Sequence, residues 1–96
     1  MLDTYTQKIK KLYKRINNNQ QRNMKLVHKF GTVLNKAREV ARYGEWEDFV
    51  TDDCGINPII PARRSMRIAR TLTVAQAVEA GSIKAGYLKC REIDKG

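Results

Sequence analysis

The first forty residues constrain the fold most, because apolar side chains recur there at the spacing of an α-helix and no proline interrupts them. Ile9, Leu12 and Ile16 follow one another at intervals of three and four residues. After a gap, the same spacing resumes in Val27, Phe30, Leu34, Ala37 and Ala41. A period near 3.6 residues over such a length favours helix over strand, so we expect the N-terminal half of the chain to be helical.

Residues 17–23 interrupt this pattern with the sequence NNNQQRN, which holds no apolar residue. Asparagine side chains compete with a helix for the hydrogen bonds of the backbone. We therefore expect a break or kink near residues 17–19, which separates a basic helix over residues 1–19 from a second helix over residues 20–43. One continuous helix with a polar seam is the alternative that the sequence leaves open.

A glycine and a short apolar pattern follow the second helix. Gly44 suits the C′ position, where helices commonly end in a left-handed conformation. The sequence EWEDFV then predicts a short helix over about residues 45–52, in which Trp46, Phe49 and Val50 share one apolar face. Its three acids fall in the first turn, where the helix dipole favours negative charge, so we interpret them as helix-stabilising.

The next segment, DDCGINP, predicts a turn before a further helix. Gly55 suits a positive φ angle, Asn57 suits an N-cap and Pro58 suits the first helical position. Pro61 is tolerated only near a helix start, so we place the regular helix at residues 61–72, preceded by at most a single turn.

Capping residues also divide the C-terminal stretch. Thr73 is expected to cap a helix over residues 74–80 that Gly81 closes, and Ser82 to cap a last helix, IKAGYLKCREI. The chain is therefore predicted to be all-α, as one domain over residues 1–96. It would combine a long N-terminal helix or helical hairpin (1–19 and 20–43), a small helix-turn-helix-like unit (44–72) and C-terminal helices (73–96).

Residues 61–70, PARRSMRIAR, carry four arginines and no acid. At about 100° per residue, the small and apolar side chains fall on one half of the helical wheel. Arg63, Arg67 and Arg70 form a stripe on the other half, and Arg64 lies on its flank. We expect one face of this helix to pack on the domain. The arginines of the other face should be exposed and unpaired with the acids of residues 45–53.

The net charge of +9 and the isoelectric point near 9.9 indicate acidic partners. A short apolar helix, a turn and a basic amphipathic helix are the layout of a helix-turn-helix, whose second helix enters the major groove of duplex DNA. Under this hypothesis Arg63 and Arg67 approach bases or flanking phosphates and Arg70 reaches phosphate, with Arg64 the least certain contact. A solvated, purely surface helix is the alternative interpretation.

The N-terminal helix carries a second basic set, because Lys8, Lys11 and Arg15 share one helix face. We expect these side chains to track the phosphate backbone, with a solvated face as the alternative. Ile9, Leu12 and Ile16 on the same helix would leave an unfinished apolar surface. We therefore expect a second copy of the chain to cover it in a homodimer.

The sequence KAREVARYGEWEDFVTDDCGINPIIPARRSMRIA, residues 36–69, resembles a family of small helical proteins from phages, prophages and plasmids. That family shows a G-E-[WF]-x-x-[WF] run followed by a helix with the pattern A-x-R-x-M-x-x-A. The positions that match are Ala37, Arg38, Gly44, Glu45, Trp46, Phe49, Gly55, Ile56, Ala62, Arg64, Met66 and Ala69. Asn57, Ile60 and Pro61 depart from the pattern, the last two at the start of the basic helix.

This resemblance implies a regulatory DNA-binding protein of a mobile element. An alternative function is an interaction protein that binds and inhibits a host protein or a protein of a competing element. Either way, we expect a cytoplasmic protein of a bacterial cell, or of the host cell of a mobile element.

Other classes of function find little support in the chain. The sequence offers no nucleophile–base pair, metal cluster or phosphate loop, so we expect no enzyme, no catalytic residue, no metal and no cofactor. Cys54, Cys90 and the single His28 have no zinc spacing, and we interpret the cysteines as reduced, partly buried thiols. No apolar run reaches the roughly 20 residues of a membrane span, so no membrane partner is expected.

The helical faces together predict a core, in which Trp46 is the largest contributor and mostly buried. The expected core residues are Val27, Phe30, Leu34, Ala37, Trp46, Phe49, Val50, Ile56, Met66, Ala69 and Leu72.

Overall fold

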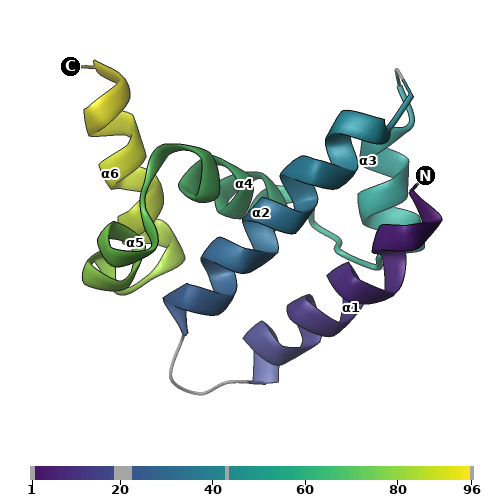
Figure 1. The fold of residues 1–96 in the computed structure, drawn as a ribbon, viewed down its shortest axis with the longest axis horizontal. Helices are drawn as coiled ribbons and strands as arrows, with labels where there is room; N and C mark the ends of the chain where they lie inside the picture. Colours follow the sequence, from purple (N-terminus) through teal and green to yellow (C-terminus); the bar gives the residue numbers. More distant parts are fainter. Residues whose placement is uncertain (1, 19–22, 43, 96) are drawn as a thin grey trace.

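The computed structural model describes residues 2–18, 23–42 and 44–95, and these form helices and connecting turns without a strand (Figure 1). The prediction of an all-α fold is confirmed. The elements are α1 (Asp3–Asn18), α2 (Met24–Val40), α3 (Trp46–Asp48), η1 (Phe49–Asp53), α4 (Ile60–Thr71), α5 (Val74–Ala80) and α6 (Ile83–Lys95).

The predicted break between the first two helices is confirmed, because Asn23 has an extended backbone, with φ −83° and ψ 100°, and α2 begins at Met24. Asn23 caps α2, and its side-chain oxygen accepts hydrogen bonds from the backbone nitrogens of Lys25 at 3.0 Å and Leu26 at 3.4 Å. These bonds satisfy amide groups that a helix start leaves without an intrahelical partner. Part of the expected second helix, residues 20–22, lies outside the described residues.

The second helix ends earlier than predicted. Ala41 is extended, with φ −73° and ψ 142°, so Gly44 is not the C′ residue of α2. Gly44 does adopt a positive φ of 84°, but in the turn that follows. The carboxylate of Glu45 accepts a hydrogen bond from the backbone nitrogen of Arg42, and the backbone nitrogen of Glu45 donates to the Arg42 carbonyl at 3.1 Å. This turn satisfies the backbone locally and allows the helix to stop before the glycine.

The short apolar helix is confirmed as the continuous segment Trp46–Asp53, whose second half widens into a π-helix. Gly55 has the expected positive φ, at 72°. The expected cap at Asn57 and Pro58 is wrong, because α4 begins at Ile60 and its N-cap residue is Ile59. Pro61 lies in the first turn of α4, where its missing N–H leaves no hydrogen bond unmade.

The C-terminal helices follow the predicted caps. Thr73 and Gln76 form a capping box at the start of α5, and Gly81 closes that helix with a φ of 82°. The Ser82 hydroxyl accepts a hydrogen bond from the backbone nitrogen of Ala85 at 3.1 Å, at the start of α6. In each case the side chain that sets the boundary lies within three residues of it.

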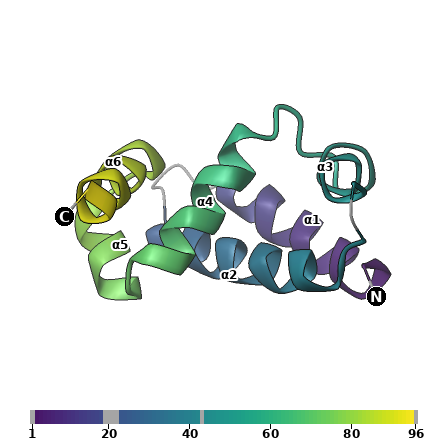
Figure 2. The same ribbon diagram turned by 90° about the horizontal axis from the view of Figure 1, so that it is seen from above.

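Helix α4 lies at the centre of the fold and packs chiefly against α2 and then α6 (Figure 2). Gly31 of α2 and Ser65 of α4 meet at the crossing, where the absence of a side chain at Gly31 allows the two backbones to approach closely. The order of short helix, turn and basic helix is as predicted. However, α4 rests mainly on α2, and the linker of residues 54–59 is longer than the three or four residues of a typical helix-turn-helix turn.

The core agrees with most of the expected residues and corrects three expectations. Trp46 and Ala69 are only partly buried, Trp46 on the short helix α3 and Ala69 at the crossing of α4 with Gly31 of α2. Ile9 and Leu12, expected to be exposed on α1, are 0% and 4% exposed. Helix α1 folds back onto α2 and buries its apolar face within its own chain, so the reason for expecting a dimer no longer holds.

The core also contains hydrophobic residues of α2, α4, α5 and α6, and one that follows η1, which were not predicted as core residues. They are Met24, Leu26, Val33, Cys54, Ala62, Ile68, Ala77 and Cys90.

Candidate arginine-lined binding site

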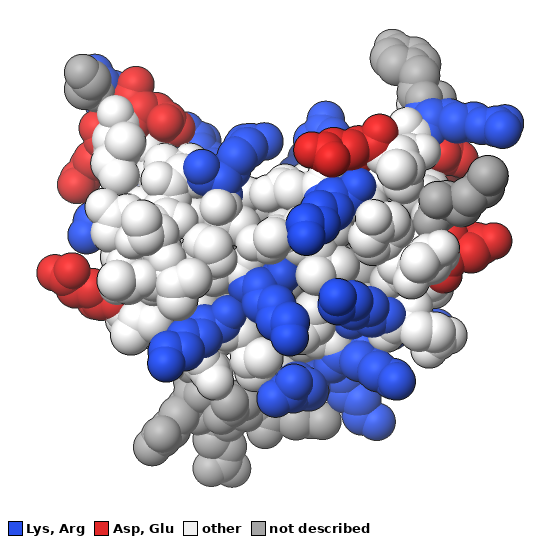
Figure 3. All heavy atoms as spheres, viewed as in Figure 1, with Lys and Arg blue, Asp and Glu red and all other residues white. Residues whose placement is uncertain are grey.

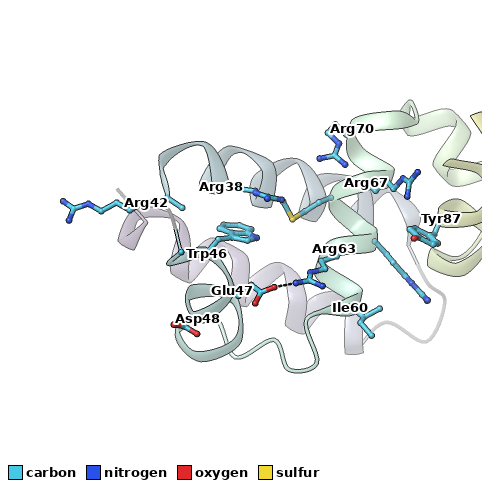
Figure 4. Close-up of a pocket in the computed structure, with 14 residues that line it drawn as sticks. Arg38, Arg42, Trp46, Glu47, Asp48, Ile60, Arg63, Arg67, Arg70 and Tyr87 are labelled. Atoms are coloured by element: carbon cyan, nitrogen blue, oxygen red, sulfur yellow. Dashed lines mark hydrogen bonds and ion pairs between the residues drawn. The ribbon is translucent and has the colours of Figure 1, made fainter. Parts of the chain in front are cut away.

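A hollow of about 960 Å³ opens beside the basic face of α4. Helix α3 and the C-terminal end of α2 line one side of it, and α6 lines the other (Figures 1 and 4). In the space-filling view, the upper edge of the molecule is notched between α6 and the end of α2 (Figure 3). We name this hollow the arginine recess, because six of the nine arginines of the chain line it: Arg38, Arg42, Arg63, Arg64, Arg67 and Arg70.

The amphipathic pattern of α4 explains how four of these arginines reach the recess. Ala62, Ser65, Met66 and Ile68 are buried against the rest of the fold. Arg63 and Arg70 are exposed, whereas Arg64 and Arg67 are partly buried. The expected packed face of this helix is therefore confirmed. The expected exposure of its arginines holds for Arg63 and Arg70 but is wrong for Arg64 and Arg67.

The expectation that these arginines are unpaired with the acids of residues 45–53 is wrong for Arg63, and Arg67 pairs with an acid outside that stretch. Arg63 forms an ion pair with Glu47 of α3 (Figure 4), and Arg67 forms one with Asp94 of α6. The partners are far apart in sequence and meet because α3 and α6 stand on either side of α4. The pair of Arg63 and Glu47 is more than half exposed on both sides, at 58% and 63%, so it contributes little to stability.

Arg67 is held by two neighbours on α6. Its guanidinium donates hydrogen bonds to Asp94, and these bonds raise the pKa of Arg67 above its ordinary value. Its guanidinium carbon lies 5.4 Å from the ring centroid of Tyr87, and that of Arg64 lies 5.2 Å from the same ring. Both distances suit a cation–π contact. Tyr87 therefore orients two guanidinium groups at one side of the recess.

Trp46 forms part of the opposite side. Its ring lies 5.8 Å from that of Phe49, centroid to centroid, and it is partly buried against the core. In the close-up, Trp46 and Arg38 lie near each other, while the Arg42 side chain extends away from the other labelled residues (Figure 4). The recess thus combines guanidinium groups with one aromatic side chain on each side.

The predicted basic residues of α1 do not join the α4 arginines. Lys8, Lys11 and Arg15 are exposed, but no residue of α1 lines the recess. Basic side chains gather over α1 and α2, away from the notch (Figure 3). The expected DNA-binding residues are therefore divided between the arginine recess and a second basic surface. The exposed basic residues outside the recess include Lys8, Lys11 and Arg15 of α1 and Lys25, Lys29 and Lys36 of α2, and we call these six residues together the outer basic surface.

Four residues that line the recess were not predicted as site residues from the sequence: Arg38, Arg42, Trp46 and Tyr87. Arg38 lies seven residues after Gly31, so the two share a helix face, and that face meets α4. The crossing of α2 and α4 brings Arg38 beside the recess. Sequence spacing alone does not show which helix a face will meet.

The described residues contain no cluster of three or more His, Cys, Asp or Glu side chains able to hold a metal ion. Cys54 and Cys90 are free and buried. Burial raises the pKa of the Cys54 thiol to about 11, with a further contribution from the charge of Asp53. The ring of His28 forms a hydrogen bond of 2.8 Å with the Leu72 carbonyl, which gives this histidine a structural contact at the end of α4.

None of the helices in the described ranges is both long enough and apolar enough to span a membrane. No protein-family model, curated protein or solved structure matches the chain.

Proposed function

We propose that this protein binds DNA through the arginine recess and acts as a regulatory DNA-binding protein of the type that mobile elements carry. The observation that carries the proposal is that arginine, and not lysine, lines the recess. Six arginines line the recess, and none of the lysines, all of which lie in the described ranges, does so. The planar guanidinium group binds phosphate in a bidentate manner and stacks on aromatic rings, which the lysine ammonium does not.

Phosphate contact fits the position of α4 better than base readout does. A recognition helix must project in order to enter a major groove about 12 Å wide. Helix α4 is instead flanked by α3 and by α6, whose side chains line the same hollow. We therefore assign the arginines to the sugar-phosphate backbone, where contacts give affinity and position but carry no sequence information directly.

The outer basic surface supports the same function. Its lysines extend the positive potential of the molecule beyond the recess and, with a net charge of +9, favour rapid association with a polyanion. Lys8, Lys11 and Arg15 remain proposed phosphate contacts on this surface, separate from those in the recess.

A second candidate function is inhibition of a host protein, or of a protein from a competing element, through an acidic surface. The ion pairs of Arg63 with Glu47 and of Arg67 with Asp94 favour it, because the recess arginines already bind carboxylates. The DNA hypothesis ranks first because Arg64 and Arg70 have no carboxylate partner within the described residues.

Binding to a labelled random DNA sequence, measured over a range of salt concentrations, tests the proposal. Affinity should fall steeply with salt, since each neutralised phosphate contributes a slope of about −0.9 for duplex and about −0.7 for a single strand. The double variant Arg64→Ala/Arg70→Ala should bind at least tenfold more weakly and show a shallower slope. It leaves no acid without its partner, so folding should be preserved.

Arg91→Ala/Lys95→Ala is the matched control, since it removes the same charge from exposed positions of α6 that do not line the recess. It should retain most of the affinity. Equal losses in the two double variants would mean that net charge alone drives binding. Absence of DNA binding at low salt would contradict the proposal and favour the acidic protein partner.

A further inference from the structure

The arginine recess combines several guanidinium groups with one aromatic side chain on each side. We propose that it receives a single strand of DNA, an inference that rests on the proposed DNA-binding function. Helix α3 lines one side of the recess and α6 the other, with the arginines of α4 between them (Figure 4).

The bases of a single strand are free to stack on aromatic side chains, whereas the bases of a duplex are stacked on one another. The sugar-phosphate backbone of a single strand can lie along the stripe of Arg63, Arg67 and Arg70 while its bases meet the rings at the sides of the recess. Arg67 is only 29% exposed, so it is set back from the open surface and suits a strand that enters the recess.

The side chains on either side of the recess fit the exposed bases of such a strand. Proteins that bind single strands combine a positive groove for the backbone with aromatic side chains on which bases stack. Trp46 lies on one side and Tyr87 on the other. Both are partly buried, so their rings are held by the fold while part of each surface remains accessible.

Tyr87 also holds two arginine side chains of the recess in place. Arg64 and Arg67 lie over its ring at 5.2 and 5.4 Å, and Asp94 fixes Arg67 from the side. Bases stack on guanidinium planes as well as on aromatic rings. We therefore assign Tyr87 the role of a positioning residue, which holds two guanidinium groups ready for phosphate contact or base stacking.

The test compares binding of the full chain to a 12-nucleotide oligo(dT) and to a 12-base-pair duplex at the same salt concentration. The duplex has more phosphates, so purely electrostatic binding would favour it. We expect the single strand to bind at least tenfold more tightly. Trp46 is the only tryptophan, so its fluorescence should be quenched by the oligonucleotide and remain nearly unchanged with the duplex.

Variants of Tyr87 test the contribution of the ring. Tyr87→Leu should lose about tenfold in affinity for oligo(dT), a loss in the range that one base–aromatic stack provides. Tyr87→Phe retains the ring and should retain the affinity. Leu88→Ala is the control, because Leu88 is an exposed neighbour on α6 that does not line the recess, and circular dichroism should show that all variants remain folded.

The outcomes separate this inference from the function on which it rests. Duplex binding as tight as single-strand binding, without tryptophan quenching, would overturn the single-strand inference and leave DNA binding in place. Failure of both DNA forms to bind would overturn both, and binding of poly-glutamate alone would assign the recess to an acidic protein. Unchanged oligo(dT) binding by Tyr87→Leu would overturn the role of Tyr87.

Discussion

Gly31 and Ser65 are in such close contact that a Cβ atom added to Gly31 would lie 2.0 Å from the Ser65 carbonyl oxygen. This contact sets the distance between α2 and α4, and therefore places Arg38 of α2 beside the arginines of α4. A glycine in the middle of a helix costs stability. Here it allows a helix crossing on which both the core and the recess depend.

Gly31→Ala should destabilise the protein by about 3 kcal/mol or prevent folding, because the added methyl group meets backbone atoms that cannot rotate away. Urea unfolding followed by circular dichroism measures the effect. Gly55→Ala is the control, since position 55 has a positive φ of 72° but nothing within 4 Å of an added Cβ. It should cost only about 1 kcal/mol. Equal costs would argue against the close crossing.

Ile9→Ala should cost roughly 2–5 kcal/mol, because Ile9 is 0% exposed in the core formed by α1 and α2. Ile93→Ala, at a position 44% exposed on α6, should change stability by less than about 0.5 kcal/mol. Denaturant unfolding of the two variants provides the comparison. Similar unfolding midpoints for the two variants would mean that α1 does not pack on its own chain. A homodimer that covers Ile9 would then again be the expected arrangement.

Trp46→Ala should cost less stability than Phe49→Ala, although tryptophan is the larger side chain. Phe49 is 3% exposed, whereas Trp46 is only partly buried at the edge of the recess. Removing a buried phenylalanine typically costs about 3–5 kcal/mol. Thermal melts of the two variants give the ranking. A greater loss for Trp46→Ala would restore tryptophan as the main core residue of this region.

Cys54 should remain unreactive towards thiol reagents at pH 8 in the native protein and react in urea, because the residue is 3% exposed and the pKa of its thiol is raised to about 11. The neutral thiol is the form that the fold favours. The corresponding stability is present below the unfolded pKa near 9 and is lost as the pH rises towards 11.

Stability measured from pH 8 to pH 11 should therefore fall more steeply in the parent protein than in Cys54→Ala. Rapid labelling of one thiol per native chain would place Cys54 at the surface instead.

The sequence by itself determined the helical class and several helix boundaries. Thr73, Gly81, Ser82 and Gly55 were assigned correctly because caps and positive-φ turns depend on residues only a few positions away. The basic faces of α1 and α4 could also be predicted, since helical spacing alone places the side chains of each face together. The boundaries predicted at Asn57 and Gly44 were wrong, because α4 begins after Ile59 and α2 ends before Ala41, and neither residue carries a capping signal in the sequence.

Only the tertiary structure decided which faces meet. Helical periodicity shows that Ile9 and Leu12 form a face, but not whether α2 or a second chain covers it. Likewise, 16 residues separate Arg63 from Glu47 and 27 separate Arg67 from Asp94, so packing alone brings each pair together. The arginine recess arises in the same way, because contacts between distant segments depend on the packing of whole helices rather than on local spacing.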